Sequence, residues 1–162
     1  MTSPPSSDRA ALSAALAQHP FFAELSATEL EQLAACAVRR ELPAGQPLIH
    51  EGEPASCFYA LLRGKVAIQL NVPARGQVTL QTLAAGEVLG WSWMMPAARW
   101  SFDARTLQPT EALELDGPAV LKLCEADPLL GYRLMTRLSR VMAERLRAAR
   151  LQLLDIYGAP RK

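Results

Sequence analysis

The chain has 162 residues, of which 50% are hydrophobic and 20% are charged, and its formal net charge is +1. That length fits one domain with a substantial hydrophobic core. The nearly balanced charge excludes a global field that would attract nucleic acid or an anionic membrane, and no apolar run approaches the length of a membrane span.

The first 40 residues are predicted to be a short tail followed by helices. Residues 1–8 lack the apolar stretch of a secretory signal, and we expect a disordered tail there. After Asp8, apolar residues recur at helical spacing. Further on, Ser26 and Glu29 form a capping-box pattern that opens a second helix. Helices are therefore expected over residues 9–40.

Between residues 41 and 116 the pattern changes to short strands. Glycines separate short runs that are apolar, alternating or β-branched: PLIH, CFYALL, KVAIQL, QVTLQTL, WSFDART and EALELD. Strands at this spacing indicate an antiparallel sandwich, barrel or jelly roll. The string LLRGKV predicts a tight hairpin at Arg63 and Gly64. NVPARGQ predicts a looser hairpin, in which Pro73 cannot join the ladder.

Residues 117–158 are predicted to form two helices. Pro118 stands at the start of a short helix, and Asp127 with Pro128 opens a long one that ends near Tyr157. Along the long helix an apolar seam repeats about every 3.5 residues, which is typical of a coiled coil. The seam residues expected at a homodimer interface are Met135, Leu138, Met142, Leu146, Ala149 and Leu153, continuing to Ile156.

A second apolar stripe on the same helix is available for packing on the strands; it contains Leu134, Val141, Ala148 and Leu151. Two stripes on one helix favour a homodimer. The alternative is that the seam itself is the face that packs on the strands.

Other chemistry finds little support in the sequence. Three cysteines without a common short spacing argue against disulfides and a zinc site, and for a reducing, cytoplasmic compartment. The string HEGE at residues 50–53 invites a metal site, but the chain has only two histidines, His19 and His50. There is no P-loop, and no nucleophile stands beside a plausible base. We expect no metal, no cofactor and no catalysis.

The order of helices, glycine-punctuated strands, a short helix and a long helix resembles the cyclic-nucleotide-binding domain of the catabolite activator protein superfamily. The resemblance rests on HPFFAELSATELEQLA, LPAGQPLIHEGEPASCFYALLRGKVAI and LAAGEVLGWSWMMPAARWSFDART, and it extends from His19 to about Tyr157. It implies one domain over residues 9–158. The expected fold class is α+β, mainly β: an antiparallel β-roll or jelly-roll barrel at 41–116, flanked by N-terminal helices and a long C-terminal helix.

The third of these strings, within residues 86–106, is similar to the family's phosphate-binding cassette, a tight turn and short helix that holds the cyclic phosphate. The resemblance makes Arg99 the phosphate-binding arginine and Gly90 the glycine that opens the turn. A helix N-terminus and a guanidinium are both suited to phosphate. The ligand-binding residues it implies are Gly90, Trp91, Ser92, Ala98, Arg99, Trp100 and Ser101.

The cassette departs from the family pattern at three positions, and two of these departures introduce aromatic rings. The family usually has a glutamate after the glycine, which accepts a hydrogen bond from the ribose hydroxyl. Here Trp91 stands there, and its N–H can only donate. Ala98 precedes Arg99 where proline is usual, and Trp100 follows it where alanine is usual. With Trp93, the rings either stack on a planar ligand or fill the pocket.

Two functions follow as hypotheses. The first is a stand-alone regulatory sensor that binds a cyclic nucleotide or another anionic ligand. The second is a ligand-free module for dimerisation or for an unknown protein partner, with a tryptophan-filled pocket. Relatives that regulate transcription carry a helix-turn-helix domain after the long helix, where this sequence has only GAPRK. We therefore expect no DNA binding, and no membrane partner.

Overall fold

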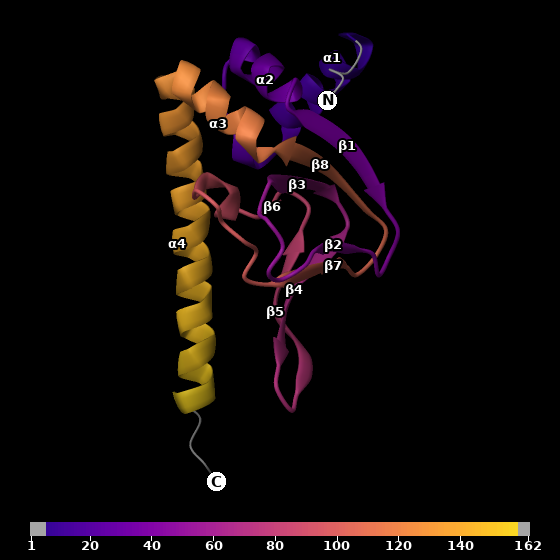
Figure 1. Ribbon diagram of the computed structural model, residues 1–162, viewed down its shortest axis with the longest axis vertical. Helices are drawn as coiled ribbons and strands as arrows, with labels where there is room; N and C mark the ends of the chain where they lie inside the picture. The colour runs from indigo at the N-terminus through magenta and orange to yellow at the C-terminus, as the bar shows by residue number, and fades with distance from the viewer. Residues whose placement is uncertain (1–5, 159–162) are drawn as a thin grey trace.

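The computed structural model describes residues 6–158 of the chain (Figure 1). The expected disordered tail, residues 1–8, lies mostly outside this range, and its last three residues belong to the first helix. In chain order the elements are α1 (Ser6–Gln18), η1 (Pro20–Phe22), α2 (Ala27–Ala34), β1 (Ala37–Leu42), β2 (Pro47–Ile49), β3 (Cys57–Arg63), β4 (Lys65–Val72), β5 (Gly76–Ala84), β6 (Val88–Leu89), η2 (Ser92–Met94), β7 (Asp103–Thr106), β8 (Thr110–Asp116), α3 (Gly117–Ala126) and α4 (Pro128–Gly158).

The strands form two antiparallel sheets of four strands each, in the orders β1-β8-β3-β6 and β2-β7-β4-β5. The expected α+β fold of a β-roll between helices is confirmed. Two details differ: the sheets do not close into a barrel, and helices, at 42% of residues, exceed strands at 33%. The long α4 accounts for much of that excess because it continues alongside the roll (Figure 1).

The expected hairpin at Arg63 and Gly64 is instead a corner between the two sheets. β3 pairs with β6 and β8, whereas β4 pairs with β5 and β7. Gly64 has φ of +97°, and a Cβ there would lie 2.4 Å from the Thr110 Oγ1 atom. Only glycine fits so sharp a turn against the neighbouring segment at Thr110. The looser β4–β5 hairpin is confirmed, with Val72 opposite Gly76.

The helical prediction for residues 9–40 is wrong at its end, where β1 begins at Ala37. β1 pairs with β8 over its whole length, from Ala37 opposite Leu115 to Leu42 opposite Thr110. Arg39 and Arg40 form ion pairs with carboxylates of β8. Pairing with a distant strand therefore overrode the local helical pattern.

One sheet separates two hydrophobic cores. Along β3 the side chains alternate: Phe58 packs with the helices, whereas Tyr59 packs inside the roll between the two sheets. β6 repeats the alternation, because Val88 belongs to the helix-side core and Leu89 to the roll core. Successive residues of a strand point to opposite faces of the sheet. β3 and β6 therefore contribute side chains to both hydrophobic cores.

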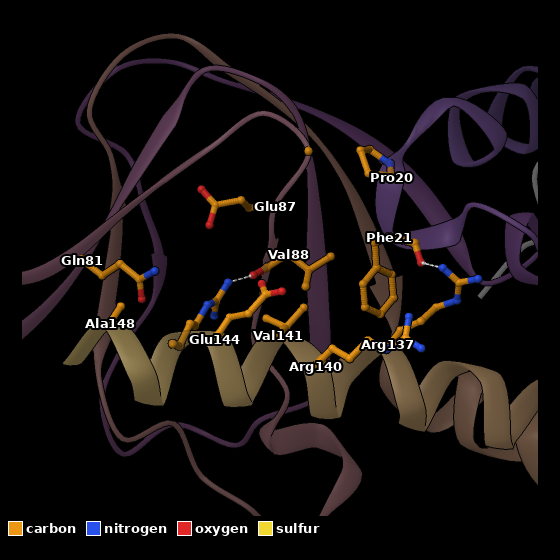
Figure 2. Close-up of a pocket in the computed structure, with 12 residues that line it drawn as sticks. Pro20, Phe21, Gln81, Glu87, Val88, Arg137, Arg140, Val141, Glu144 and Ala148 are labelled. Atoms are coloured by element: carbon orange, nitrogen blue, oxygen red, sulfur yellow. Dashed lines mark hydrogen bonds between the residues drawn. The ribbon is translucent and has the colours of Figure 1, made fainter. Parts of the chain in front are cut away.

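The middle of α4 faces η1 and β6. Figure 2 shows Val141 and Arg140 of the helix opposite Phe21 and Val88, with a cavity between these elements. Beyond this region the helix is more exposed: Leu151 and Leu154 are 54% and 66% exposed. No helix among the described residues is long and apolar enough to cross a membrane.

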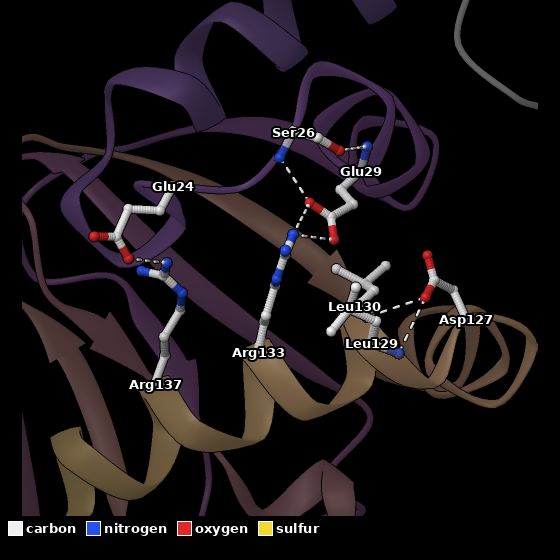
Figure 3. Close-up of polar contacts among 8 residues, drawn as sticks. All are labelled: Glu24, Ser26, Glu29, Asp127, Leu129, Leu130, Arg133 and Arg137. Atoms are coloured by element: carbon white, nitrogen blue, oxygen red, sulfur yellow. Dashed lines mark hydrogen bonds and ion pairs between the residues drawn. The ribbon is translucent and has the colours of Figure 1, made fainter.

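The start of α4 is joined to the N-terminal helices by polar contacts (Figure 3). The predicted capping box is confirmed: the Glu29 N–H donates to Ser26 Oγ over 3.2 Å, and the Ser26 N–H donates to Glu29 Oε2 over 2.6 Å. The same carboxylate accepts from Arg133 of α4, whose Nη1 atom lies 2.9 Å from Glu29 Oε1. Asp127 caps α4 by accepting from the N–H of Leu130 over 3.1 Å.

Candidate ligand-binding cassette

The cassette begins with a tight turn after β6. Gly90 has φ of +86°, and a Cβ at this position would lie 2.7 Å from the ring of Trp100. The turn therefore requires glycine both for its backbone conformation and for the ring beside it. Trp91 follows as the N-cap of η2, and its side chain makes no capping hydrogen bond.

Trp100 fills the interior of the roll next to this turn. Its side chain is 5% exposed and belongs to the roll core with Tyr59 and Leu89. Its ring centre lies 6.0 Å from that of Phe102. In the cassette, the position where the resemblance implies a small alanine therefore carries a large ring packed inside the chain.

Trp93 belongs to the other core. It is buried and stacks on Phe58 of β3, with ring centres 5.1 Å apart and an angle of 13° between the planes. A Cβ on Gly117 would lie 2.8 Å from the Trp93 Cβ atom, so the start of α3 packs directly against this residue. Trp93 thus joins the cassette to the helices and does not face the roll interior.

Trp91 is half-buried and contacts Arg145 of α4. The Cζ atom of Arg145 lies 4.9 Å from the centre of the Trp91 ring, a cation–π contact. The Nη2 atom of Arg145 also donates to the backbone oxygen of Val88. Sequence reasoning did not find Arg145, because nothing in the sequence separates it from the other arginines of this helix.

Arg99 is exposed at the surface of the roll. Its Nη1 atom donates to the Gly52 backbone oxygen over 2.7 Å, and the backbone N–H of the next residue, Trp100, donates to the Glu53 backbone oxygen over 2.9 Å. Among the described residues Arg99 forms no ion pair. Asp103, the carboxylate nearest to Arg99 in the sequence, accepts instead from the Glu51 N–H over 2.9 Å.

The remaining predicted ligand residues differ in accessibility. Ser92 is buried, Ala98 is half-buried and Ser101 is exposed. The backbone of Ala98 already accepts from the Ala55 N–H over 2.9 Å, which fixes this segment against residues 52–55. Within the predicted set, the ring of Trp100 lies directly against Gly90 and occupies the space where a side chain at position 90 would stand.

The roll core is predominantly apolar. Burial raises the pKa of the Tyr59 hydroxyl, and burial also raises the pKa of the nearby Cys57 thiol. Both groups are therefore neutral at physiological pH. The exposed cations within residues 86–106 are Arg99 and Arg105, and each donates a hydrogen bond to a backbone oxygen.

The predicted dimer residues fall into two groups. Leu138 is 1% exposed and packs in the chain's own helix-side core, so it is not available to a second copy. Met135 and Met142 are half-buried, whereas Leu146, Ala149 and Leu153 are exposed. The seam therefore divides along the helix: its first turns pack inwards, and its later turns face outwards.

The model of the cyclic nucleotide-binding domain family matches residues 39–127. A cyclic nucleotide-binding domain from Methylobacillus flagellatus superposes with a TM-score of 0.77 at 21% identity, covering 95% of this chain and 85% of that one. The catabolite activator protein of Thermus thermophilus superposes with a TM-score of 0.67 at 28% identity, covering 86% of this chain and 63% of that one.

Two curated relatives are much longer proteins. An uncharacterized NTE family protein of Mycobacterium tuberculosis is 31% identical over 130 residues, which are 80% of this chain and 22% of that protein. Glutaminase 1 of Bradyrhizobium diazoefficiens is 30% identical over 131 residues, 81% of this chain and 21% of that protein. The chain thus spans about a fifth of the length of these relatives.

Proposed function

Because the chain belongs to the cyclic nucleotide-binding domain family, we propose that it is a regulatory module whose β-roll is filled by its own tryptophan and does not respond to ordinary cyclic nucleotides. The family fold supports the regulatory role. The observation that carries the rest is Trp100, which lies against Gly90 and is 5% exposed in the roll core.

Trp91 supports the same proposal. An indole N–H cannot accept a hydrogen bond from a ribose hydroxyl. Moreover, the Trp91 ring is already engaged by Arg145, at 4.9 Å from the ring centre. A nucleotide would have to displace Trp100 and would still lack its usual acceptor.

The test is thermal unfolding and calorimetry with cyclic AMP and cyclic GMP. A ligand at about 100 times its Kd adds about 2.7 kcal/mol to the free energy of unfolding. For a chain of this size that is a rise of several degrees in Tm. We expect no rise for the native chain. A rise with either nucleotide, together with saturable heat of binding, would overturn the proposal.

A second candidate function is binding of a different anion at Arg99. It is favoured by one observation: the Arg99 guanidinium is exposed and forms no ion pair within the described part of the chain. Inorganic phosphate and sulfate titrations on the native chain and on Arg99→Ala test it. Loss of binding in that variant supports the candidate, and equal behaviour of both proteins removes it.

We propose that α4 is the element through which the module contacts the unit that it regulates. Leu146 and Leu153 are 53% and 54% exposed on its outer part, a surface suited to a homodimer or to a protein partner. The likeness to regions of much longer proteins supports control of a neighbouring or partner unit. We propose no catalysis, no DNA partner and no membrane partner for the chain itself, and a cytoplasmic location given its three free cysteines.

A further inference from the structure

The cavity between α4 and the strands is separate from the roll interior. Its volume is about 480 Å³, and its walls come from η1, the β5–β6 segment and the middle of α4 (Figure 2). Val88 lines it with a side chain on the helix side of β6, whereas the next residue, Leu89, packs inside the roll. The cavity therefore lies on the opposite face of this sheet from Trp100.

One wall of the cavity is apolar. Phe21 of η1, Val88 of β6 and Val141 of α4 line it together, and Figure 2 shows their side chains near one another. A volume of this size lies within the range of sites for small organic molecules, which combine such apolar walls with a few polar groups.

The most unusual polar group of the cavity is Arg145. Its Nη2 atom donates to the Val88 oxygen, and its Nη1 atom is buried without a hydrogen-bond partner. Burial lowers the pKa of Arg145, although a guanidinium stays charged in a protein. A buried cationic nitrogen without a partner is costly, and an anion that turns it towards the cavity would recover that cost.

The other charged groups of the cavity are partly engaged. Arg137 donates to the Phe21 oxygen and pairs with Glu24, which lies outside the cavity. Glu87 accepts from the Ala84 N–H over 2.8 Å. Arg140 and Arg145 form no ion pair among the described residues, although the charges of Glu87 and Glu144 act on Arg145 and favour its charged form.

We propose that this cavity binds a small amphipathic carboxylate, with the carboxylate group on Arg145 and the apolar body against Phe21, Val88 and Val141. This site is separate from the roll interior, and the proposal does not rest on whether the roll binds a nucleotide. Because Arg145 also contacts Trp91, occupancy of the cavity changes the surroundings of the cassette.

The experiment is a titration of the full chain with 4-phenylbutyrate, followed by the three tryptophan indole N–H signals in NMR spectra. We expect the Trp91 signal to shift saturably, because Arg145 moves against that ring, whereas Trp93 and Trp100 change little. The neutral amide and the corresponding amine of the same compound should bind about ten- to hundredfold more weakly, since neither pairs with a guanidinium. Preferred binding of the amine would mean that the glutamates dominate, and would overturn the proposal.

Three variants localise the site. Arg145→Ala should weaken 4-phenylbutyrate binding about ten- to hundredfold. Arg150→Ala, an exposed arginine on the same helix outside the cavity, should leave it unchanged. Ala148→Phe keeps Arg145 and places a large side chain in the cavity about one helical turn from it, so it should also weaken binding even if removing Arg145 loosens α4. Binding as tight as in the native chain in folded Ala148→Phe, or no saturable shift in the native chain, overturns the proposal.

Discussion

At the scale of single residues, a nucleotide site needs an empty space for the ligand and an acceptor for the ribose hydroxyl. Trp100 and Trp91 each remove one of the two. Trp100 occupies the space inside the roll, and Trp91 stands where the family has an acceptor for the ribose. The structure adds a third factor, because a carboxylate placed at position 91 would meet Arg145, which lies 4.9 Å from the Trp91 ring. Repairing one requirement alone is therefore not expected to restore a site.

We predict that Trp91→Glu alone gains no affinity for cyclic AMP. Combined with Trp100→Ala, which empties the roll, it should bind about tenfold more tightly than Trp100→Ala alone, the lower end of the value of a hydrogen bond to a charged acceptor, because Arg145 competes for the same carboxylate. Calorimetry on protein shown to be folded measures this. Adding Arg99→Ala should remove the gain, and a gain that survives it would show that Arg99 is not the phosphate ligand.

His19 provides a pH-dependent prediction at the same scale. It is 3% exposed, and its Nδ1 atom accepts from the Phe21 N–H over 3.2 Å, which requires an unprotonated nitrogen. Burial lowers the pKa of His19 below 6.5, and the carbonyl oxygens of Glu87 and Leu61 offset only part of this. The unfolded chain therefore takes up a proton at a higher pH than the folded chain.

We thus expect the free energy of unfolding to decrease as pH falls through 6.5 towards the lower pKa of the folded state, by about 1.4 kcal/mol for each unit between the two pKa values. Urea unfolding between about pH 7.5 and 5.5 measures the slope. His50→Gln, at an exposed histidine, should keep the slope, and His19→Gln should flatten it. An unchanged slope in His19→Gln would assign the effect to other groups.

At the scale of elements, the polar contact between α2 and α4 is made by one carboxylate, that of Glu29. Burial acts to raise the pKa of Glu29, but hydrogen bonds from Ser26 and the charge of Arg133 outweigh it, so the pKa is lowered below 4.5 (Figure 3). A carboxyl whose pKa is lower in the folded state stabilises the fold above its unfolded pKa, and this stabilisation is lost as pH falls through the folded pKa.

We predict that Glu29→Gln lowers the free energy of unfolding by about 1–2 kcal/mol at neutral pH, since Arg133 is partly solvated and the capping bond is weakened. It should also reduce the acid sensitivity below pH 4.5. Glu24→Gln is the matched control, because that side chain is 87% exposed where it pairs with Arg137. Equal losses in the two variants in urea unfolding would contradict the assignment.

The outer part of α4 carries the prediction on assembly. We expect the native chain to be a homodimer, and Leu146→Glu with Leu153→Glu to give a folded monomer, because both leucines are more than half exposed. Leu129→Glu, at an equally exposed leucine near the start of the helix, should remain dimeric. Light scattering measures the mass. If the native chain is a monomer at micromolar concentration, the proposed homodimer interface is wrong. Leu138→Asp does not test it, because it places a charge in the chain's own core.

The elements differ in how well the sequence predicts them. Short-range signals identified the Ser26 capping box, the Asp127 cap and the β4–β5 turn, because each is determined by a few neighbouring residues. β1 and the corner at Gly64 were missed, because both depend on partners on β8, more than 40 residues away in the chain. In the cassette, the tight turn at Gly90 was predicted, whereas the contact of Arg145 with Trp91 depends on how α4 docks.

At the scale of the whole molecule, charges are balanced and dispersed. The net charge is +1, and several arginines are already paired, such as Arg133 with Glu29 and Arg40 with Glu114. We predict that the chain does not bind DNA by itself. Electrophoretic shifts should be absent at about 200 mM salt, since scattered phosphate contacts weaken steeply with ionic strength. A shift that persists at that salt concentration with a random duplex would contradict this.

The alternation along β3 offers a practical rule for redesigning this protein. Position 58 and position 60 belong to the helix-side core, and positions 59 and 61 belong to the roll core. The even-numbered positions of this strand thus determine how the helices pack on the sheet, and the odd-numbered positions determine the shape of the roll interior. A library varied only at the odd positions and at Trp100 can search for new small-molecule receptors while the even positions keep the helical scaffold constant. A shift of β3 by one residue would turn the side chains that face the helices into the roll, and those that face the roll towards the helices. Such a library must therefore preserve the register of this strand.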